Sequence, residues 1–560
     1  MRLINATTLA IEIFFDGHAP PYAVLSHRWH DGEVSLQEMQ NSTAFERPGY
    51  VKIVQTCALA ARDGLGYAWV DTCCIDKTSS AELSVAINSM YRWYREAKVC
   101  YAFLSDVEDD DVEADAGAAA FASSAWFSRG WTLQELLAPS KVEFYNVSWH
   151  KIGTKATLGT AIVAKTGIDM YALNGGDLAA FSIARRMSWA AGRKTTVPED
   201  TAYCLFGLFG VNMPMLYGEG ERAFIRLQEE IMKHSADHSL FAWSSNEPGA
   251  RGLLARSPAD FVGCADIIVT RERWNKTPYT VTNLGLSIEL PMLPWAMETY
   301  LAVLDCERAG VPDSRVGIFL RLLPQADQHA RVALGGEDTF VFTEELAEKL
   351  MYRNVFVQQH LWGMTLEHQR FYGFYLRNFS SPIHTVTKTE SEQVSLSTVD
   401  LATTQVAWDD EKRLLELPVG KNGTVGMITW ARDGKNWEVL KFGFDNEFNP
   451  ALQLGGDYRS PNRPLTMDPK SAEDWLDPSW MDGPAHSKYL HKAERLRGLH
   501  EEVFITEKRI SIEEGEIGET GMKGWVIDIL DHTPRYRRYQ DLCEGCVNLS
   551  KPVRKFRISS

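Results

Sequence analysis

A strand–helix–strand alternation fills the first 150 residues and constrains the fold more than any other feature of this chain. Short apolar runs suited to strands stand at Tyr22–Ser26, Tyr67–Asp71, Val99–Leu104 and Val142–Tyr145. The segments between them carry apolar residues at the spacing of a helix. Because parallel strands require long crossover connections, this alternation predicts an α/β fold in which helices cover a parallel sheet.

Three of the intervening segments have helix signals of their own. The segment 51–62 places valines and alanines at helical spacing, at Val51, Val54, Ala58 and Ala61. Ser79–Glu82 has the pattern of a capping box, which predicts that a helix starts there. Trp131–Leu137 is a short helical segment that ends before Pro139.

The remaining sequence predicts two further regions. Residues 151–245 are mainly helical: Thr196–Glu199 has the pattern of a second capping box, and Gly218–Gly220 opens a helix that continues to about Lys233. From residue 246 onward, alternating segments separated by turns such as Asn422–Gly423 predict antiparallel β structure. We therefore divide the chain into an α/β domain (1–150), a helical extension (151–245) and a β-rich C-terminal region of unknown role (246–560).

Composition argues against several classes of protein. The 560 residues are 45% hydrophobic and 24% charged, which is usual for a folded globular protein. With 58 basic and 74 acidic residues the net charge is −16, which argues against binding nucleic acid or an anionic membrane through bulk charge. No apolar run reaches the ~20 residues of a membrane span, and Asn5 and Glu12 argue against a signal peptide. The 9 cysteines are scattered and odd in number, so we expect reduced thiols and a cytoplasmic location.

Polar side chains gather where the predicted strands end, and ligands of open α/β sheets bind at this edge. The sequence collects there Ser26, His27, Arg28 and Trp29 after the first strand, Asp71, Thr72, Cys73, Cys74 and Asp76 after the second, and Ser105 and Asp106 after the third. We therefore expect a binding site at this edge. Trp69, in the middle of a strand, is expected in the core instead.

Three long sequence blocks resemble those of the fungal heterokaryon-incompatibility (HET) domain. They are YAVLSHRW at Tyr22–Trp29, YAWVDTCCID at Tyr67–Asp76 and SRGWTLQELLAP at Ser128–Pro139. The stretch Ala184–Gly220 resembles the helical extension that commonly follows this domain. The resemblance thus covers about residues 20–245 of the chain.

The resemblance implies a cytoplasmic protein of filamentous fungi that restricts fusion between genetically different cells. On recognition of non-self it would trigger programmed cell death, a form of innate immunity. The implied fold is similar to that of Toll/interleukin-receptor (TIR) domains. Other proteins are the expected partners, and a homo-oligomer is expected on activation, without nucleic acid and without a membrane span. The chain has no G-x-x-x-x-G-K-[S/T] phosphate loop, which argues against ATP-driven assembly by the chain itself.

The similarity to TIR domains singles out Glu135 as the catalytic residue. In plant TIR domains a Trp-Cys-Leu-Asp-Glu-Leu motif, on the helix after the third strand, carries the glutamate used to hydrolyse NAD. Trp131–Leu136 has the same place here, and Thr132 and Gln134 depart from the motif. NAD or a related nucleotide is then the expected substrate, because a carboxylate can stabilise the ribosyl cation formed as the glycosidic bond breaks. The alternative is an ordinary surface glutamate on a short helix.

The residues at the strand ends would then bind the nucleotide. Arg28 can pair with a pyrophosphate through its planar guanidinium group, and Trp29 or Trp131 can stack on a base or a nicotinamide ring. Asp71 or Asp76 can bind ribose hydroxyls, although Asp76 can instead cap the following helix. Ser26 and His27 complete the expected set. This set requires no cofactor, with NAD as a substrate, and no metal.

Two other mechanisms stay open. In the first, the α/β domain is a non-catalytic signalling module that acts through homotypic contacts, and the β-rich region senses a partner. In the second, a thiolate of Cys73 or Cys74, activated by His27, is the nucleophile of a hydrolase. The competing explanation for these two cysteines is that they are small side chains that fill the core.

Basic and cysteine-containing motifs elsewhere have simpler explanations. Arg185, Arg186, Arg193 and Lys194 can hold a phosphate, but we expect them to pair with Glu199, Asp200 or the acidic stretch Asp106–Asp115. Cys543–Cys546 is a single C-x-x-C motif, which offers too few ligands for zinc. Arg535–Tyr539 alternates arginine with tyrosine and is expected to contact protein rather than nucleic acid.

Overall fold

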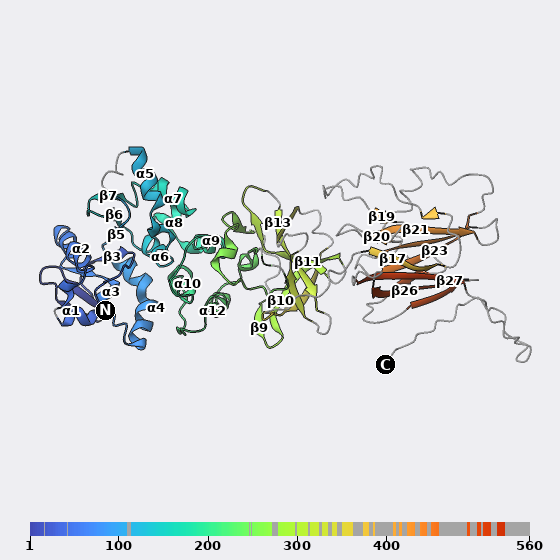
Figure 1. Cartoon of the computed structure of the whole chain (residues 1–560), viewed down its shortest axis with the longest axis horizontal. Helices are drawn as coiled ribbons and strands as arrows, with labels where there is room; N and C mark the ends of the chain where they lie inside the picture. The colour runs from blue at the N-terminus through green and yellow to red at the C-terminus, as the bar shows by residue number, and fades with distance from the viewer. Residues whose placement is uncertain are drawn as a thin grey trace, which may run out of the picture.

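The computed structural model places the parts of the chain one after another along a long axis (Figure 1). An α/β part comes first, then a helical part, then two groups of strands. The structure describes residues 1–361 except 16, 42, 109–113, 246, 248, 271–277, 297–298, 312–313, 324–327, 334–338 and 344–349. Beyond residue 361 it describes only the strands that lie between residues 373 and 531.

The N-terminal sheet has seven strands in the order β2-β1-β4-β3-β5-β6-β7. Its central strands β4, β3, β5 and β6 run parallel, as predicted, whereas β1, β2 and β7 add antiparallel edges that the sequence did not indicate. All six residues of β3 are buried, as expected for a strand that is covered on both faces. The bounds are β1 (Arg2–Asn5), β2 (Ile11–Ile13), β3 (Tyr22–His27), β4 (Tyr67–Trp69), β5 (Val99–Phe103), β6 (Val142–Tyr145) and β7 (Lys151–Thr154).

The helices around this sheet are α1 (Leu36–Gln40), η1 (Ala44–Glu46), α2 (Tyr50–Arg62), α3 (Asp71–Cys74), α4 (Ser80–Glu96), α5 (Ala114–Ser123), η3 (Ala125–Ser128) and α6 (Thr132–Leu137). Helix α4 begins as predicted, because the Ser79 side chain accepts a hydrogen bond from the backbone N–H of Glu82.

Helix α2 forms where the sequence predicts it, but the predicted apolar stripe faces outward. Val51 is 57% exposed and Val54 is 37% exposed. The buried face instead carries residues such as Ile53 and Cys57. Both faces of α2 carry apolar residues, so the packing against β3 and β4 decides which one is buried.

The helical part contains α7 (Gly159–Thr166), α8 (Met170–Leu173), η4 (Leu178–Ala180), α9 (Ile183–Ser188), α10 (Asp200–Tyr203), α11 (Phe206–Phe209), α12 (Arg222–Met232), η5 (His238–Phe241) and η6 (Pro258–Phe261). Helix α12 confirms the prediction of a helix after Gly220. The capping box predicted at Thr196–Glu199 is wrong: Glu199 is itself the N-cap of α10 and makes no side-chain cap there. The Glu199 carboxylate instead accepts the backbone N–H groups of Gly218 and Gly220, a tertiary contact invisible to local sequence patterns.

The first group of strands contains a closed ring. Strand β10 pairs with β11, β11 with β13, β13 with β14, β14 with β16, and β16 again with β10. The pairs are antiparallel except for β14 with β16. The bounds are β8 (Ile267–Val269), β9 (Thr280–Thr282), β10 (Gly285–Ala296), β11 (Thr299–Leu304), β12 (Cys306–Arg308), β13 (Ser314–Leu322), β14 (His329–Val332), β15 (Thr339–Thr343) and β16 (Met351–Val357).

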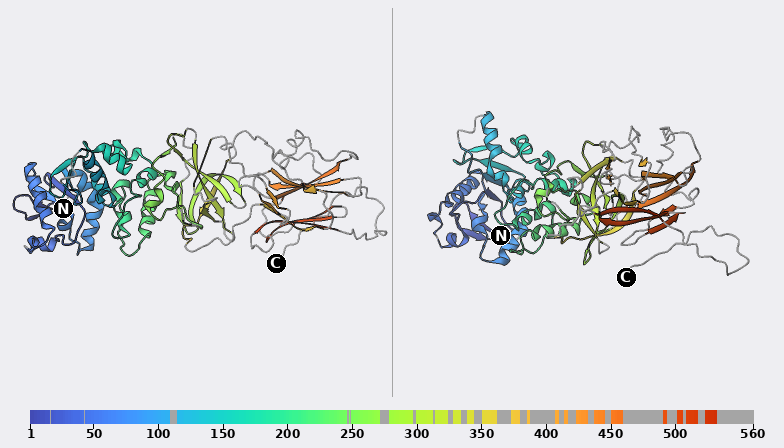
Figure 2. Two further views of the ribbon diagram at one scale, coloured as in Figure 1. Left: turned by 45° about the horizontal axis from the view of Figure 1, so that its top comes forward. Right: turned by 45° about the vertical axis from the view of Figure 1, so that its right-hand side comes forward.

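The second group of strands forms two sheets, which Figure 2 shows as separate layers. One has the order β19-β20-β17-β27-β26-β25 and the other β18-β21-β22-β23-β24. Most pairs are antiparallel, so the predicted antiparallel β-rich character of the C-terminal region is confirmed. The bounds are β17 (Gly373–Phe379), β18 (Thr385–Val386), β19 (Ala407–Asp409), β20 (Leu414–Glu416), β21 (Gly423–Ala431), β22 (Trp437–Phe444), β23 (Pro450–Tyr458), β24 (Leu490–Lys492), β25 (Glu501–Ile505), β26 (Lys508–Glu516) and β27 (Lys523–Asp531).

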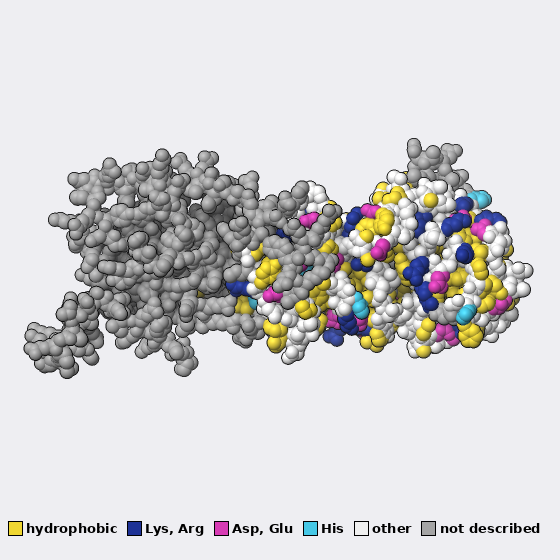
Figure 3. Space-filling model, turned by 180° about the vertical axis from the view of Figure 1, so that it is seen from behind, with side chains coloured by type: hydrophobic (Ala, Val, Ile, Leu, Met, Phe, Trp, Pro, Cys, Tyr) yellow, Lys and Arg dark blue, Asp and Glu magenta, His cyan; other side chains and the backbone are white. Residues whose placement is uncertain are grey.

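One hydrophobic core runs from the N-terminal sheet through the helical part to the strand ring, from Leu3 to Val357. Trp69 is fully buried in it, as predicted. On the face seen in Figure 3, basic, acidic and apolar side chains of the described residues are interspersed. In the part of the chain that the structure describes, no helix combines the length and apolar character needed to cross a bilayer.

Candidate functional site

Strand β3 delivers the first residues of the site. Ser26 and His27 are its last two residues and are 0% and 3% exposed, whereas Trp29, just beyond the strand, is 45% exposed. Strand β3 pairs with β4 on one side and with β5 on the other. The strand order therefore reverses here, which is the point where open α/β sheets bind ligands.

Glu135, on helix α6, points into the protein toward this strand end. Its side chain is buried, and its Oε2 accepts a hydrogen bond of 2.5 Å from the Ser26 hydroxyl. The Ser26 Oγ in turn accepts a hydrogen bond of 2.9 Å from the indole nitrogen of Trp126. The three side chains therefore form a buried chain, and Glu135 is not the exposed surface residue of the alternative interpretation.

Polar contacts at both ends fix the position of α6. At the start of the helix, the Thr132 hydroxyl donates to the carbonyl oxygens of Trp126 and Arg129, at 2.6 and 2.9 Å. At its end, the buried Lys155 ammonium group donates to the carbonyl oxygens of Leu136 and Pro139. Cations near a helix C-terminus stabilise the helix, although burial lowers the pKa of Lys155 to about 8.

The carboxyl group of Glu135 titrates near neutral pH. Burial raises its pKa from 4.5 to about 7, and the negative charge of Asp71 acts in the same direction. The charges of Arg129 and Arg193 and the hydrogen bond from Ser26 act in the opposite direction. A carboxyl group shifted by burial against specific charged partners is a common feature of functional sites.

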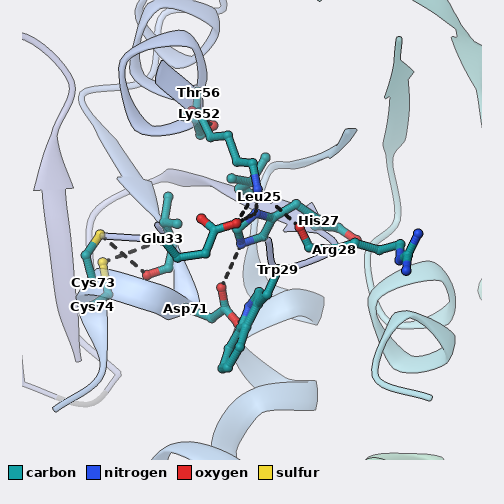
Figure 4. A network of polar contacts seen from close by, with 12 residues as sticks. Leu25, His27, Arg28, Trp29, Glu33, Lys52, Thr56, Asp71, Cys73 and Cys74 are labelled. Atoms are coloured by element: carbon teal, nitrogen blue, oxygen red, sulfur yellow. Dashed lines mark hydrogen bonds and ion pairs between the residues drawn. The ribbon is translucent and has the colours of Figure 1, made fainter. Parts of the chain in front are cut away.

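A second set of contacts centres on His27 (Figure 4). Its Nε2 lies 3.1 Å from Oδ1 of Asp71, and its Nδ1 lies 3.2 Å from the ammonium nitrogen of Lys52. Because an ammonium group only donates, Nδ1 must accept from Lys52, and we infer that the proton on Nε2 is donated to Asp71. The other oxygen of Asp71 accepts a hydrogen bond of 2.9 Å from the indole of Trp29. Lys52 is held in turn by an ion pair with Glu33.

Asp71 and Glu135 are shifted in opposite directions. Burial acts to raise the pKa of Asp71, but the contact with His27 and the charges of Lys77 and Arg129 outweigh burial and hold this pKa well below its usual range. The site therefore contains one carboxylate that stays ionised and one carboxyl group that exchanges its proton near pH 7. Environments that separate two carboxyl groups in this way are typical of sites where each has a different role.

Two cations lie over the ring of Trp29. The ammonium nitrogen of Lys77 is 3.6 Å from the ring centroid, and the guanidinium carbon of Arg129 is 5.2 Å from it. Within the described part of the chain, the Arg129 guanidinium group makes no hydrogen bond. Cations on a half-exposed indole, next to two carboxyl groups, can bind an anionic group such as a phosphate.

The structure thus brings five predicted site residues together, namely Ser26, His27, Trp29, Asp71 and Glu135. The three other predicted residues are directed elsewhere. The Arg28 side chain extends away from Asp71 and Trp29 (Figure 4). Asp76 accepts hydrogen bonds from Gln37 and Thr78 in the turn before α4, and the Trp131 indole donates to Asp200 of the helical part at 3.0 Å.

The ends of the other strands make local contacts. Ser105 Oγ lies 3.3 Å from Nε2 of His30, and Asp106 accepts hydrogen bonds from Ser124 and the backbone N–H of Ala125. Cys73 and Cys74 are buried, and the contact with Cys74 together with burial raises the pKa of Cys73 well above its usual range. A thiol of this kind is a poor nucleophile, so the geometry favours a packing role over a Cys–His pair.

Sequence reasoning missed Lys52, Lys77, Trp126 and Arg129. Arg129 stands inside the third sequence block, next to Gly130, and Lys77 directly follows the second block. The place of Arg129 within Ser128–Pro139 and that of Lys77 directly after Tyr67–Asp76 are signals that could have identified them. No local signal identifies Lys52, which lies between the exposed valines of α2.

The basic group of the helical part is engaged, but with partners other than the expected ones. Arg185 pairs with Asp169, Arg186 donates to the carbonyl oxygen of Leu208, and Arg193 donates to Thr132 and to the carbonyl oxygen of Arg129. The motifs at 535–539 and 543–546 lie outside the described residues. Within the residues that are described, no group of three or more His, Cys, Asp or Glu side chains is placed to hold a metal ion.

The N-terminal part is thus an α/β domain whose central strands run parallel. Its candidate site lies where the strand order reverses and combines a buried carboxyl group with cations. Residues 22–119 match the family model described as Heterokaryon incompatibility protein (HET), so this α/β part is a HET domain, as the sequence blocks predicted. Residues 222–251 match a domain of unknown function, DUF8212.

A curated relative is the vegetative incompatibility protein HET-E-1 of Podospora anserina, which is 48% identical over 223 residues. The matched segment makes up 39% of this chain, but it spans only 16% of the length of that relative. No solved structure matches the chain.

Proposed function

We propose that this chain is an effector of vegetative incompatibility that triggers cell death on recognition of non-self, and that its HET domain hydrolyses NAD or a related nucleotide. The similarity to HET-E-1 and the HET family supports the first part of the proposal. In this proposal the HET domain shares its fold with TIR domains. The protein acts in the cytoplasm of a fungal cell, binds other proteins and assembles with copies of itself on activation.

The observation that carries the enzymatic part is the buried contact between Glu135 and Ser26, next to Asp71 and the cations over Trp29. In NAD hydrolysis, the bond between C1′ of the ribose and the nicotinamide nitrogen breaks, and nicotinamide leaves with the electron pair. The Glu135 carboxylate would stabilise the positive charge that develops on the ribose. Water then adds to C1′ and releases a proton, which gives ADP-ribose.

The remaining residues of the site suit the other parts of this substrate. Trp29 offers a half-exposed ring for stacking, and Arg129 offers a guanidinium group for the pyrophosphate. Asp71 stays ionised at neutral pH and can accept hydrogen bonds from ribose hydroxyls. The reaction requires no cofactor from outside.

The test is an assay of nicotinamide release by the full chain incubated with NAD, with and without forced clustering. The variant Glu135→Gln keeps the size of the side chain but removes its charge, and Glu46→Gln is a matched control at an exposed position. Turnover that is lost in Glu135→Gln and kept in Glu46→Gln supports the proposal. Absence of turnover under both conditions, or equal turnover in Glu135→Gln, refutes the enzymatic part.

A second candidate function is a non-catalytic contact module, which the outward face of α2 favours. Val51, Val54 and the nearby Phe45 are 57%, 37% and 68% exposed, and apolar side chains on one helix face suit contacts between copies of a domain. Expression of Glu135→Gln in fungal cells separates the two functions. Cell death that persists without nicotinamide release supports the contact module, whereas loss of cell death supports the enzyme.

A further inference from the structure

The helical part holds the loop that precedes α6. The backbone N–H of Lys194 donates to the carbonyl oxygen of Ser128 at 2.7 Å, and the N–H of Gly130 donates to the carbonyl oxygen of Lys194 at 2.8 Å. These bonds form an isolated bridge between Arg129 and Lys194. The backbone of the loop that carries Arg129 is thus paired with a segment about 65 residues further along the chain.

The two segments approach each other closely at position 130, where glycine has no side chain to meet the neighbouring groups. A Cβ atom on Gly130 would lie 2.6 Å from Cγ2 of Thr195 and 3.1 Å from Sγ of Cys204. Contacts below 3.0 Å between carbon atoms force neighbouring groups to move. The position of the loop is therefore defined by the surface of the helical part.

Arg193 extends this contact to helix α6. Its Nη1 donates to the carbonyl oxygen of Arg129 and to the hydroxyl of Thr132, both at 3.0 Å, and its Nε donates to the carbonyl oxygen of Trp189. Its Nη2 is buried and has no hydrogen-bond partner within the described residues. Trp131 adds a third link through its bond to Asp200.

Arg193 also acts on Glu135 through its charge. It is one of two arginines that favour the ionised form of this carboxyl group, the other being Arg129, whose loop it holds. Glu135 in turn favours the charged form of Arg193. The titratable and charged groups that face Glu135 from the surrounding elements are Arg129, Asp71, Arg193, Tyr94, Cys100 and Cys204.

The same segment is tied to the start of α12. The Glu199 carboxylate accepts the N–H groups of Gly218 and Gly220, and Asp200 accepts a hydrogen bond from the Tyr217 hydroxyl. Contiguous contacts therefore lead from the loop before α12, through Glu199 and Asp200, to Trp131 and the helix of Glu135. The helical part and α6 are therefore joined by an unbroken series of contacts, which is the kind of connection that coupling between two parts of a protein uses.

We propose that Arg193 is a positioning residue through which the segment from Trp189 to Cys204 holds the carboxyl site in its working arrangement, so that displacement of this segment switches the site off. The inference rests on the proposed function only in naming the switched activity. The coupling between Arg193 and Glu135 can be measured without turnover.

The test compares Arg193→Gln, Arg193→Lys and the exposed control Arg222→Gln in the full chain. The titration of Glu135 is followed by NMR of chains labelled with ¹³C at the glutamate carboxyl, and Glu135→Gln identifies its signal. Loss of a nearby positive charge raises the pKa of a carboxyl group by about one unit or more. We therefore expect the midpoint to rise by about one pH unit in Arg193→Gln. We expect a smaller rise in Arg193→Lys and no change in Arg222→Gln.

The result that overturns the inference is an unchanged midpoint in Arg193→Gln, or an equal change in Arg222→Gln. If Arg193→Gln does not fold, Arg193→Lys takes its place. This variant keeps the charge but loses the planar group that donates to Arg129 and Thr132. An unchanged midpoint of Glu135 in Arg193→Lys would then show that these hydrogen bonds do not position the site. Nicotinamide release is measured on the same samples as a function of pH. Absence of turnover in the unmodified chain contradicts the proposed function alone, whereas turnover with the same pH profile in Arg193→Gln contradicts the coupling alone.

Discussion

Replacement of Glu135 by glutamine should stabilise the protein at high pH and have little effect at low pH. The pKa of Glu135 is about 7 in the folded chain and 4.5 in the absence of burial. Below pH 4.5 both the folded and the unfolded chain hold the proton, so the group adds no pH-dependent cost. Between these two values the unfolded chain releases the proton while the folded chain keeps it, and the free energy of unfolding falls as the pH rises.

Above pH 7 the folded carboxyl group is ionised as well, and the decrease in unfolding free energy stays at its full value. The difference of about 2.5 pH units corresponds to about 3 kcal/mol of lost stability. Glutamine cannot ionise, so the gain in unfolding free energy from Glu135→Gln should grow by about 3 kcal/mol between pH 4 and pH 8.5. A carboxyl group that costs stability at working pH is typical of sites that are maintained for function.

The measurement is urea unfolding of the full chain at a series of pH values, with the difference between variant and parent taken at each pH. This difference removes the contribution of every other titrating group that is distant from Glu135. Glu46→Gln, which removes a charge from an exposed side chain, serves as the control and should show no comparable trend. A pH-independent difference for Glu135→Gln would refute the reasoning, because it would mean that the carboxyl group ionises as easily in the folded chain as in water.

Three further predictions concern neighbouring residues. The rate of NAD cleavage should increase with pH through about 7, where Glu135 ionises. Ser26→Ala should move this transition to higher pH, because it removes the hydrogen bond that favours the ionised carboxylate. Initial rates between pH 5 and 9 measure the transition in the parent and in the variant. Cys73→Ala should leave NAD cleavage within about twofold, and Cys73 should resist iodoacetamide in the folded chain, which mass spectrometry can follow, because its thiol is buried and protonated. Gly130→Ala should lower the unfolding free energy by about 1–3 kcal/mol, and Thr195→Ser should restore part of it by removing the methyl group that the new Cβ meets; thermal unfolding of the double variant tests this.

The sequence predicted the elements of the site better than their orientation. The central strands and the gathering of Ser26, His27 and Asp71 follow from apolar runs and from the rule that parallel strands share one carboxyl edge, whereas Glu135 was predicted from the resemblance to TIR domains. The fold brings into contact residues that are 109 positions apart in the sequence, such as Ser26 on β3 and Glu135 on α6.

Other features depend on contacts that no local pattern contains. Helix α2 carries apolar residues on both faces. The spacing of these residues therefore could not predict that Val51 is exposed or that Lys52 contacts His27. Trp131 is drawn to Asp200 by the packing of the helical part against the HET domain. Arg129 enters the site because its backbone pairs with Lys194, which is a long-range event. The family match ends at residue 119, before Glu135 and Arg129, so it does not identify these residues either.

The close approach of Gly130 to Thr195 and Cys204 limits how this protein can be recombined with its homologues. A hybrid that joined the sheet of one parent to the helices of another would bring together two surfaces that had accumulated substitutions separately. A Cβ added at Gly130 would lie only 2.6 Å from Cγ2 of Thr195, so a single substitution of this glycine would be enough to misfit them. Crossovers that fall outside residues 128–204 should therefore yield functional hybrids more often than crossovers within them.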